Sequence, residues 1–126
     1  MERLLYDRDH QWVRTEGKRA VVGISEFAQA ELGEVAFVEL PAPGRRVSRG
    51  EAACMIDSLK SAGEIASPLT GTIIQVNERL ASDEGCALIN SDPLGAGWLF
   101  ALELERPEEL DELLSPEQYR RYIEEG

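Results

Sequence analysis

The sequence has little positive charge and no long apolar run. Its 13 Lys and Arg residues face 24 Asp and Glu residues, so the net charge is −11 at pH 7. A chain with this charge repels nucleic-acid phosphates and anionic membrane surfaces, and we expect neither as a partner. No apolar run approaches about 18 residues, and no basic segment followed by an apolar stretch opens the chain. We therefore expect a cytoplasmic protein without a secretion signal or a membrane span.

Cysteine, histidine and tryptophan are also scarce. Cys54 and Cys86 lie in the apolar runs AACMI and CALI without metal-ligand spacing, which predicts core residues; a disulfide or a reactive thiol is the alternative. His10 has no cysteine nearby, so we expect a structural or cleft-lining role and no metal. Trp98 follows a glycine and is expected to anchor the core. Without a nucleophile-elbow motif, a phosphate-binding glycine loop or clustered His ligands, the sequence predicts a protein that is not an enzyme.

Lysine is the scarcer of the two basic residue types. Eleven of the basic residues are arginine, and only Lys18 and Lys60 are lysine. A basic side chain that only solvates a surface can be of either type, whereas an amine that must be acylated cannot be replaced by a guanidinium. The isolation of Lys60 among arginines therefore indicates that its amine is required.

Short segments rich in β-forming residues are spread along the chain and are bounded by Gly, Pro, Asn and Asp. Their close spacing predicts a mainly β fold with two antiparallel sheets, and the length suits one domain. The expected strands are residues 19–24, 34–40, 53–57, 71–76, 86–90 and 98–103.

Two segments carry helix signals instead. Ser25 can cap a short helix that ends at Gly33 and follows an early strand. Ser115 opens the capping box SPEQ with Gln118 at its third helical position. We therefore expect a short helix after the second strand and C-terminal helices within an extension, residues 107–126, packed on the domain.

A weak internal repeat in the sequence predicts a symmetric arrangement of two halves of the fold. The segments VSRGEAACMID from Val47 and LASDEGCALIN from Leu80 align without gaps and pair Asp57 with Asn90. Two copies are too few for a solenoid, but they suit a pseudo-twofold fold in which each copy contributes a strand to a shared core.

Lys60 lies in the polar segment DSLKSAGE, which contains Gly63 and follows the apolar CMI. This pattern predicts a hairpin tip that projects into water. An ordinary surface lysine is the simplest alternative. A Schiff-base lysine is disfavoured, because that chemistry needs a desolvated pocket to lower the pKa of the amine. We therefore expect an accessible amine that is open to covalent modification.

Several sequence blocks together resemble the H-protein family of the glycine cleavage system, which are lipoyl carriers. The blocks, in family order, are DHQWV from Asp9, GISEFAQAELGEVAFVELPAPGRRV from Gly23, DSLKSAGEIASPLTG from Asp57, VNERL from Val76 and LINSDPLGAGW from Leu88. The resemblance covers nearly the whole chain. It implies a barrel-sandwich hybrid like that of lipoyl domains, with residues 1–126 forming a single lipoyl-carrier domain.

The resemblance implies that lipoate is covalently attached to Lys60 by an amide bond. It also implies partners: a pyridoxal-phosphate glycine decarboxylase that transfers an aminomethyl group from glycine, a tetrahydrofolate-dependent aminomethyltransferase that takes it over, and a dihydrolipoamide dehydrogenase that reoxidises the dithiol. A lipoate-attaching enzyme must act first. The carrier catalyses none of these steps, and we expect a monomer.

The resemblance further implies a cleft that holds the amine of the cargo. By position, Asp9 and Gln11 flank one side of this cleft, and Ser61 and Glu64 lie on the other. Carboxylates and carbonyls suit an ammonium group because charge-assisted hydrogen bonds are strong. Gln11 departs from the family, which usually has Glu there, and we expect Asp9 to supply the missing charge.

Other departures leave alternatives open. Asp57, which precedes Ser58 in the lipoyl-lysine motif, stands where the family usually has Glu, and Leu94 stands where an aromatic residue is frequent. An H-like carrier for another pathway, such as lipoate relay or sulfur metabolism, is therefore an alternative. A biotin carrier usually frames its lysine with methionines, whereas Leu59 and Ser61 flank it here. An unmodified acidic β-sandwich interaction module is the alternative outside the carriers.

Overall fold

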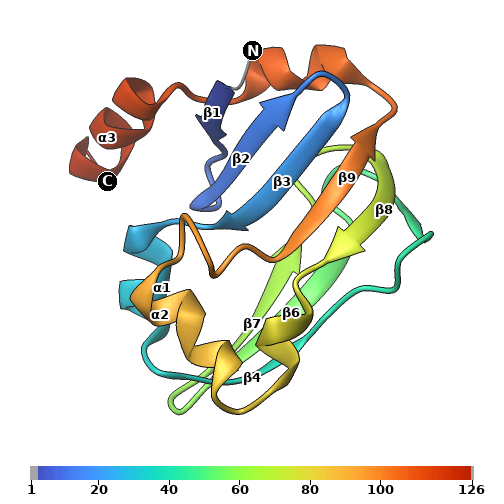
Figure 1. Ribbon diagram of the computed structural model, residues 1–126. Helices are drawn as coiled ribbons and strands as arrows, with labels where there is room; N and C mark the ends of the chain where they lie inside the picture. Colours follow the sequence, from blue (N-terminus) through green and yellow to red (C-terminus); the bar gives the residue numbers. More distant parts are fainter. Residues whose placement is uncertain (1–2, 126) are drawn as a thin grey trace.

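Two antiparallel β-sheets face each other in the computed structural model, which describes residues 3–125 (Figure 1). The six-stranded sheet has the order β1 (Arg3–Tyr6), β2 (Gln11–Glu16), β3 (Arg19–Ile24), β9 (Phe100–Leu104), β8 (Gly71–Val76) and β5 (Arg46–Val47). The three-stranded sheet has the order β4 (Val35–Glu39), β6 (Ala52–Ser58) and β7 (Ala62–Ala66). The predicted mainly β fold of two antiparallel sheets is therefore confirmed.

The predicted helix caps are also confirmed. The Ser25 hydroxyl accepts a hydrogen bond from the Ala28 N–H at 3.1 Å at the start of α1 (Glu26–Leu32), and Gly33 ends this helix with a φ of 83°. Ser115 and Gln118 exchange backbone and side-chain hydrogen bonds of 2.9 and 3.1 Å before α3 (Pro116–Glu125). Helix α1 follows the third strand and not the second, since β1, β2 and β3 all precede it.

The remaining helices are short. They are η1 (Glu78–Ala81), η2 (Gly85–Ala87), α2 (Leu88–Ser91) and the 3-10 helix η3 (Pro107–Glu112). Within the described part of the chain, no helix has the length and apolar character needed to cross a membrane. The predicted extension 107–126 contains η3 and α3, and its last residue lies outside the described residues. Helix α3 lies beside β1 at one edge of the larger sheet (Figure 1).

The core lies between the two sheets and is built from alternating residues of both. Val22, Ile73 and Phe100 of the larger sheet and Ile56 of the smaller sheet are fully buried. Burying one such side chain contributes about 1.5–3 kcal/mol, so this shared layer holds the sheets together.

Cys54 and Cys86 are both buried in this core as free thiols, as the apolar runs predicted. Burial raises the pKa of the Cys54 thiol to about 12, and it also raises the pKa of Cys86. A thiol must lose its proton to become a nucleophile, so the alternative of a reactive cysteine finds no support here.

The prediction of a strand at residues 86–90 is wrong, since the segment is helical in η2 and α2. The Ser82 hydroxyl accepts a hydrogen bond from the Gly85 N–H at 2.9 Å, and the Ser82 carbonyl accepts one from the Cys86 N–H at 3.0 Å. These bonds start the helix. Short apolar runs do not distinguish a strand from a buried helix.

The prediction that both segments of the internal repeat contribute strands to the core is wrong for the same reason. Asp57 lies in β6, whereas its aligned partner Asn90 lies in α2. The Asn90 side chain bonds to three groups: it accepts from the Val35 N–H at 2.9 Å and donates to the Gly33 carbonyl and the Gln29 side chain. Asn90 therefore joins the end of α1 to the start of β4.

The expected core role of Trp98 is also wrong. Trp98 is half-buried, whereas Trp12 is fully buried and donates its indole N–H to the Pro93 carbonyl at 2.9 Å. Gly23 lies against the Trp12 ring, and a β-carbon at Gly23 would overlap the ring atoms. Trp12 is therefore the fully buried tryptophan, and it packs with Gly23 on the face of β2 and β3 opposite the shared core.

Candidate functional site

Lys60 lies in the turn between β6 and β7, where the sequence predicted a hairpin tip. The last strand pair before the turn joins Asp57 to Ala62. The Ser58 N–H donates to the Ser61 carbonyl at 2.7 Å, and the Ser58 hydroxyl accepts from the N–H groups of Lys60 and Ser61 at 3.3 and 3.0 Å. Ser58 therefore fixes the backbone of the turn that carries the lysine.

The Lys60 side chain is exposed, and its stem runs past the end of α1. A β-carbon at Gly33 would lie 3.5 Å from Lys60 Cε, an ordinary van der Waals distance, so the stem passes directly beside Gly33. The Leu59 N–H donates to the Glu34 carbonyl at 2.9 Å and ties the turn to the segment after α1. Within residues 3–125, the Lys60 ammonium group has no hydrogen-bond or ion-pair partner. The amine is thus free to react at a well-anchored turn.

Asp57 and Glu64 lie on the solvent side of the smaller sheet. Asp57 pairs with Phe37 on one side and with Ala62 on the other, and its Oδ1 atom is buried without a hydrogen-bond partner. Glu64 is exposed and lies opposite Met55. Both carboxylates therefore belong to the face of the sheet that continues from the Lys60 turn.

Gln11 is buried at the start of β2, where its side chain is only 3% exposed. Its amide nitrogen donates to Asp7 Oδ2 and to the Ala66 carbonyl, both at 2.9 Å. Its Oε1 atom has no partner in the described part of the chain. The Ala66 contact joins Gln11 to the far end of β7, so Gln11 reaches the base of the Lys60 hairpin and offers one unused acceptor there.

Asp7 organises this side of the site, and the sequence did not single it out. Its Oδ1 atom accepts hydrogen bonds from the N–H groups of Asp9 and Gln11, each at 2.9 Å. Burial raises the pKa of Asp7 to about 6, although the N–H groups of Gln11 and Asp9 oppose this shift. An aspartate placed two and four residues before polar residues is typical of a side chain that caps a turn. That spacing was the available sequence signal.

The structure brings only some of the predicted site residues together. Asp57, Ser58, Lys60 and Ser61 share the hairpin end. Asp9 and Glu64 line two different cavities. That of Asp9 has a volume of about 330 Å³ and also includes Asp7, Arg49, Ser67 and Glu112, and that of Glu64 has a volume of about 350 Å³ and also includes Glu39, Leu40, Arg45 and Met55.

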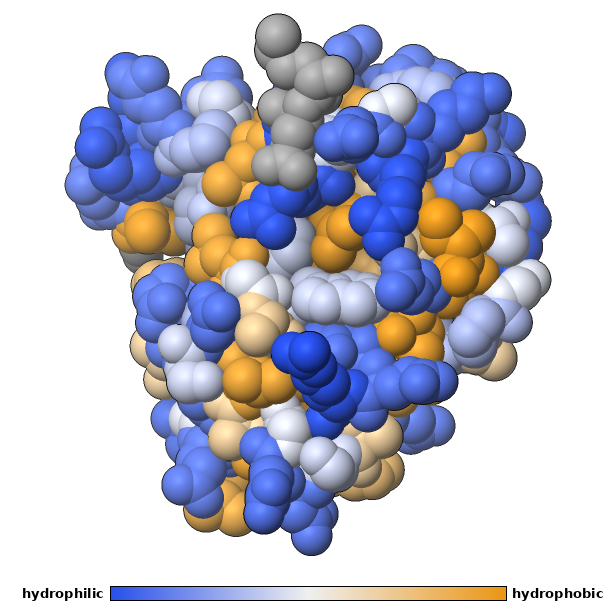
Figure 2. Space-filling model, in the orientation of Figure 1, coloured by the Kyte–Doolittle hydropathy of each residue, from blue (hydrophilic) through white to orange (hydrophobic). Residues whose placement is uncertain are grey.

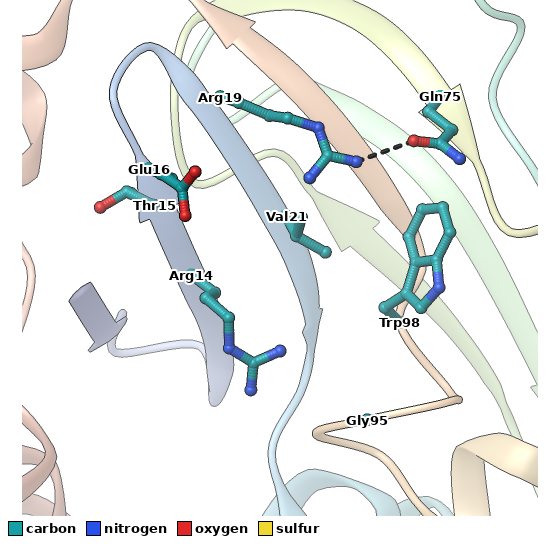
Figure 3. Close-up of a pocket in the computed structure, with 8 residues that line it drawn as sticks. All are labelled: Arg14, Thr15, Glu16, Arg19, Val21, Gln75, Gly95 and Trp98. Atoms are coloured by element: carbon teal, nitrogen blue, oxygen red, sulfur yellow. Dashed lines mark hydrogen bonds between the residues drawn. The ribbon is translucent and has the colours of Figure 1, made fainter. Parts of the chain in front are cut away.

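A third cavity lies on the larger sheet and contains none of the predicted site residues. It has a volume of about 370 Å³, and the side chains of Arg14, Arg19 and Trp98 converge on it (Figure 3). Arg19 donates to Gln75 Oε1 at 2.7 Å, and the Arg14 guanidinium lies 4.8 Å from the centre of the Trp12 ring. Glu16 also lines this cavity, so it contains charges of both signs, whereas Asp57 and Glu64 lie on the face that continues from the Lys60 turn.

Comparisons with known proteins support the resemblance over nearly the whole chain. The family model described as Glycine cleavage H-protein matches residues 4–126. A glycine cleavage system H protein from Xanthobacter autotrophicus is 44% identical over 98% of both chains. One from Carboxydothermus hydrogenoformans is 40% identical over 97% of this chain and 92% of its own.

A solved structure agrees with these relatives. The crystal structure of a glycine cleavage system H protein from Mycobacterium marinum matches 96% of both chains with a TM-score of 0.86 and 31% identity. The fold is accordingly a barrel-sandwich hybrid. The chain therefore belongs to the glycine cleavage H-protein family, the non-catalytic carriers of a covalently bound lipoyl-lysine in the glycine cleavage system.

Proposed function

We propose that Lys60 is the residue of this carrier to which lipoate is attached. The observation that supports this most is the exposed, unpaired amine at the β6–β7 turn, within the sequence block DSLKSAGE. Lys18 is exposed too, in the turn between β2 and β3, so accessibility does not separate the two lysines. What separates them is the family motif around Lys60, and Lys18 provides a matched control.

Attachment requires a free amine on a turn that keeps its shape. The amide bond would form between the deprotonated Lys60 Nζ and the carboxyl carbon of an activated lipoyl donor, while the bond from that carbon to the leaving group breaks. The leaving group would depart with the electron pair, and the protons lost by the amine would pass to it or to water. Ser58 holds the turn, and the stem of Lys60 passes beside Gly33. Acylation removes the positive charge of Lys60 and leaves the backbone contacts of the turn unchanged.

When bound, the lipoyl group supplies a redox-active disulfide on an arm of about 14 Å, which serves the glycine decarboxylase, the aminomethyltransferase and the dihydrolipoamide dehydrogenase in turn. Lys60 anchors this arm at the surface, so each enzyme meets it at an effective concentration of about millimolar. A cytoplasmic location and a monomeric state, both predicted from the sequence, belong to this proposal.

The residues proposed to hold the amine of the cargo are Asp9, Gln11, Ser61 and Glu64. The Oε1 atom of Gln11 has no partner in the described part of the chain, but it is closed to solvent, so it accepts an ammonium N–H only after the side chain turns outward. Asp9 and Glu64 line separate cavities, so the cargo must bring the two sides of the cleft together. Asp7, and not Asp9, is the carboxylate in contact with the Gln11 side chain. We therefore assign to Asp7 the negative charge that Gln11 lacks.

Intact-mass measurement tests the attachment site. Protein made in lipoate-supplied cells should carry one lipoyl increment, which Lys60→Arg abolishes and Lys18→Arg leaves in place. A biotinyl increment would indicate a biotin carrier, and an unmodified chain would favour the interaction module. The lipoylated protein should then support glycine decarboxylation with its partner enzymes. Modification without that activity would favour a lipoyl carrier of another pathway.

A further inference from the structure

The three-stranded sheet turns one face to the core and one face to solvent. Residues paired across antiparallel strands point to the same face. Val38 and Ile56 pair and are buried, so the pairs on either side of them point outward. We call this side the outer face. Its residues are Phe37, Glu39, Met55, Asp57, Ala62 and Glu64.

Large apolar side chains are exposed on the outer face and at its end. Phe37 is 55% exposed and Met55 is 38% exposed, and Leu59, next to Lys60, is 73% exposed. Figure 2 shows one view of the molecule, in which apolar side chains reach the surface among hydrophilic ones. Grouped apolar side chains rimmed by polar ones are typical of protein interaction sites. Met55 lies on β6, which ends at the lysine turn, Phe37 lies on the neighbouring β4, and Leu59 lies within that turn.

The outer face is also negatively charged. Glu39 and Glu64 have no hydrogen-bond or ion-pair partner within residues 3–125, and Asp57 keeps one buried oxygen without a partner. The nearby Arg45 does not neutralise them, because it pairs with Glu51 at 2.9 Å. A partner that covers this face must therefore bring Lys or Arg side chains of its own.

The cavity beside the outer face can accommodate a Lys or Arg side chain of the partner. Its volume is about 350 Å³, and Glu39, Met55 and Glu64 line it. The stem of a long basic side chain can lie along Met55 while its charged group reaches the two glutamates. The cavity on the other sheet differs in its charges, because Arg14 and Arg19 line it together with Glu16 (Figure 3).

The length of the unmodified Lys60 side chain determines which enzyme must contact the outer face. An enzyme that acts on the bare amine must come within about 6 Å of the Lys60 backbone, the length of the side chain. At about 3.3 Å per residue along β6, Phe37 (beside Asp57) lies about 10 Å from Lys60 and Met55 about 17 Å. A standard interface of about 800 Å² per partner is roughly 30 Å across and covers both. Enzymes reached by the extended arm do not need this contact.

We propose that the outer face of β4, β6 and β7 is the docking surface for the enzyme that attaches the lipoyl group. Its matching surface has an apolar centre that covers Phe37 and Met55 and a Lys or Arg rim that meets Glu39 and Glu64. This inference rests on the proposed attachment at Lys60. It assigns a recognition role to side chains that lie outside the lysine turn.

The first experiment removes the apolar centre. Unmodified protein serves as the substrate of the purified lipoate-attaching enzyme, and kcat/KM is measured for Phe37→Thr, Met55→Thr and the double variant. The double variant should lose about tenfold or more, as expected for contacts at the centre of an interface. The control is Ile74→Thr, because Ile74 is 44% exposed on β8 of the other sheet. It should stay within about twofold of the parent.

The second experiment removes charge and does not depend on apolar packing. The double variant Glu39→Gln/Glu64→Gln should raise KM about threefold to tenfold at low salt and should weaken the salt dependence of kcat/KM. The control is Glu103→Gln, an exposed glutamate on β9, which should change neither quantity. Because these side chains lie at the surface, this variant keeps the test open if Phe37→Thr fails to fold.

The outcomes separate this inference from the attachment site itself. Lipoylation of Lys60→Arg would overturn the proposed function. If Lys60 is modified in the parent but the outer-face variants are modified as fast as their controls, the docking surface is wrong and the attachment site stands. If these variants are modified normally but support glycine decarboxylation poorly, the face serves a later enzyme, which also overturns the assignment.

Discussion

His10 Nδ1 and the Tyr119 hydroxyl lie 2.8 Å apart, although 109 residues separate them in the sequence. The same hydroxyl lies 2.8 Å from the Ser25 hydroxyl at the start of α1, and the Tyr119 ring stacks on Tyr6 with centroids 4.2 Å apart. His10 adopts a φ of 65°, which few residues other than glycine adopt. Helix α3 therefore holds the turn before Gln11 in place through one buried tyrosine.

Tyr119→Phe should lower the free energy of unfolding by about 1–2 kcal/mol, because it removes both hydrogen bonds and keeps the ring stack. Urea denaturation measures the change. Tyr122→Phe is the control, since the Tyr122 hydroxyl makes one exposed bond to the Arg8 carbonyl at 3.1 Å. It should cost less than about 0.5 kcal/mol. Equal losses in the two variants would contradict the role given to Tyr119.

Asp7 should make stability depend on pH between about 4 and 6. Burial raises its pKa in the folded state to about 6 from the ordinary value of 3.8. The folded protein thus holds this proton more tightly than the unfolded chain does. Its stabilising contribution is complete below about pH 4 and is lost as the pH rises through about 6, with a total of about 3 kcal/mol.

The Asp7→Asn variant should lack that component of the pH dependence. The measurement is the difference in free energy of unfolding between parent and variant, followed from pH 4 to pH 7. Asp111→Asn, an exposed change in η3, should keep the slope of the parent. A parent curve parallel to that of Asp7→Asn would show that Asp7 does not titrate in this range.

Gln11→Glu should destabilise this chain at pH 7. The Gln11 amide now donates to Asp7 Oδ2 at 2.9 Å, and a glutamate there would place two carboxylates in contact and leave the Ala66 carbonyl without its donor. We expect a loss of about 2–3 kcal/mol at pH 7, most of it recovered near pH 5 when one proton is shared.

A double variant tests the same pair from the other side. Asp7→Asn/Gln11→Glu restores a donor and an acceptor with their positions exchanged, so it should recover at least half of the stability lost by Gln11→Glu. Urea denaturation of the four proteins gives the coupling between the two residues. Simple addition of the two single changes would contradict the pairing of Asp7 with Gln11.

Local sequence signals predicted the parts of the fold that depend on local contacts. Ser25 and Ser115 cap helices through bonds to residues only three positions away, and the Lys60 turn closes through Ser58 and Ser61. These contacts depend on residue type and spacing alone. The H-protein family was evident from the sequence for a similar reason, because its blocks are contiguous.

Contacts between distant segments were not predictable in this way. Trp12 and not Trp98 is buried, because Gly23 and Pro93 make room and provide an acceptor for it. The Gln11 amide nitrogen that donates to Asp7 also donates to the carbonyl of Ala66, which β7 places beside Gln11. Local sequence spacing does not predict contacts between residues that are far apart in the chain, so these contacts become evident only in the structure.

Asn90→Ala tests another set of contacts between distant segments. The Asn90 side chain accepts from the Val35 N–H and donates to Gly33 and Gln29, and alanine would leave the Val35 N–H and the Gly33 carbonyl without these partners. Because Val35 is only 5% exposed, water cannot readily replace the lost bond. We expect a loss of about 2–3 kcal/mol in the free energy of unfolding. Ser91→Ala, an exposed change at the next position, should stay within about 0.5 kcal/mol, and an equally mild effect of Asn90→Ala would mean that Asn90 does not hold α1 and β4 together.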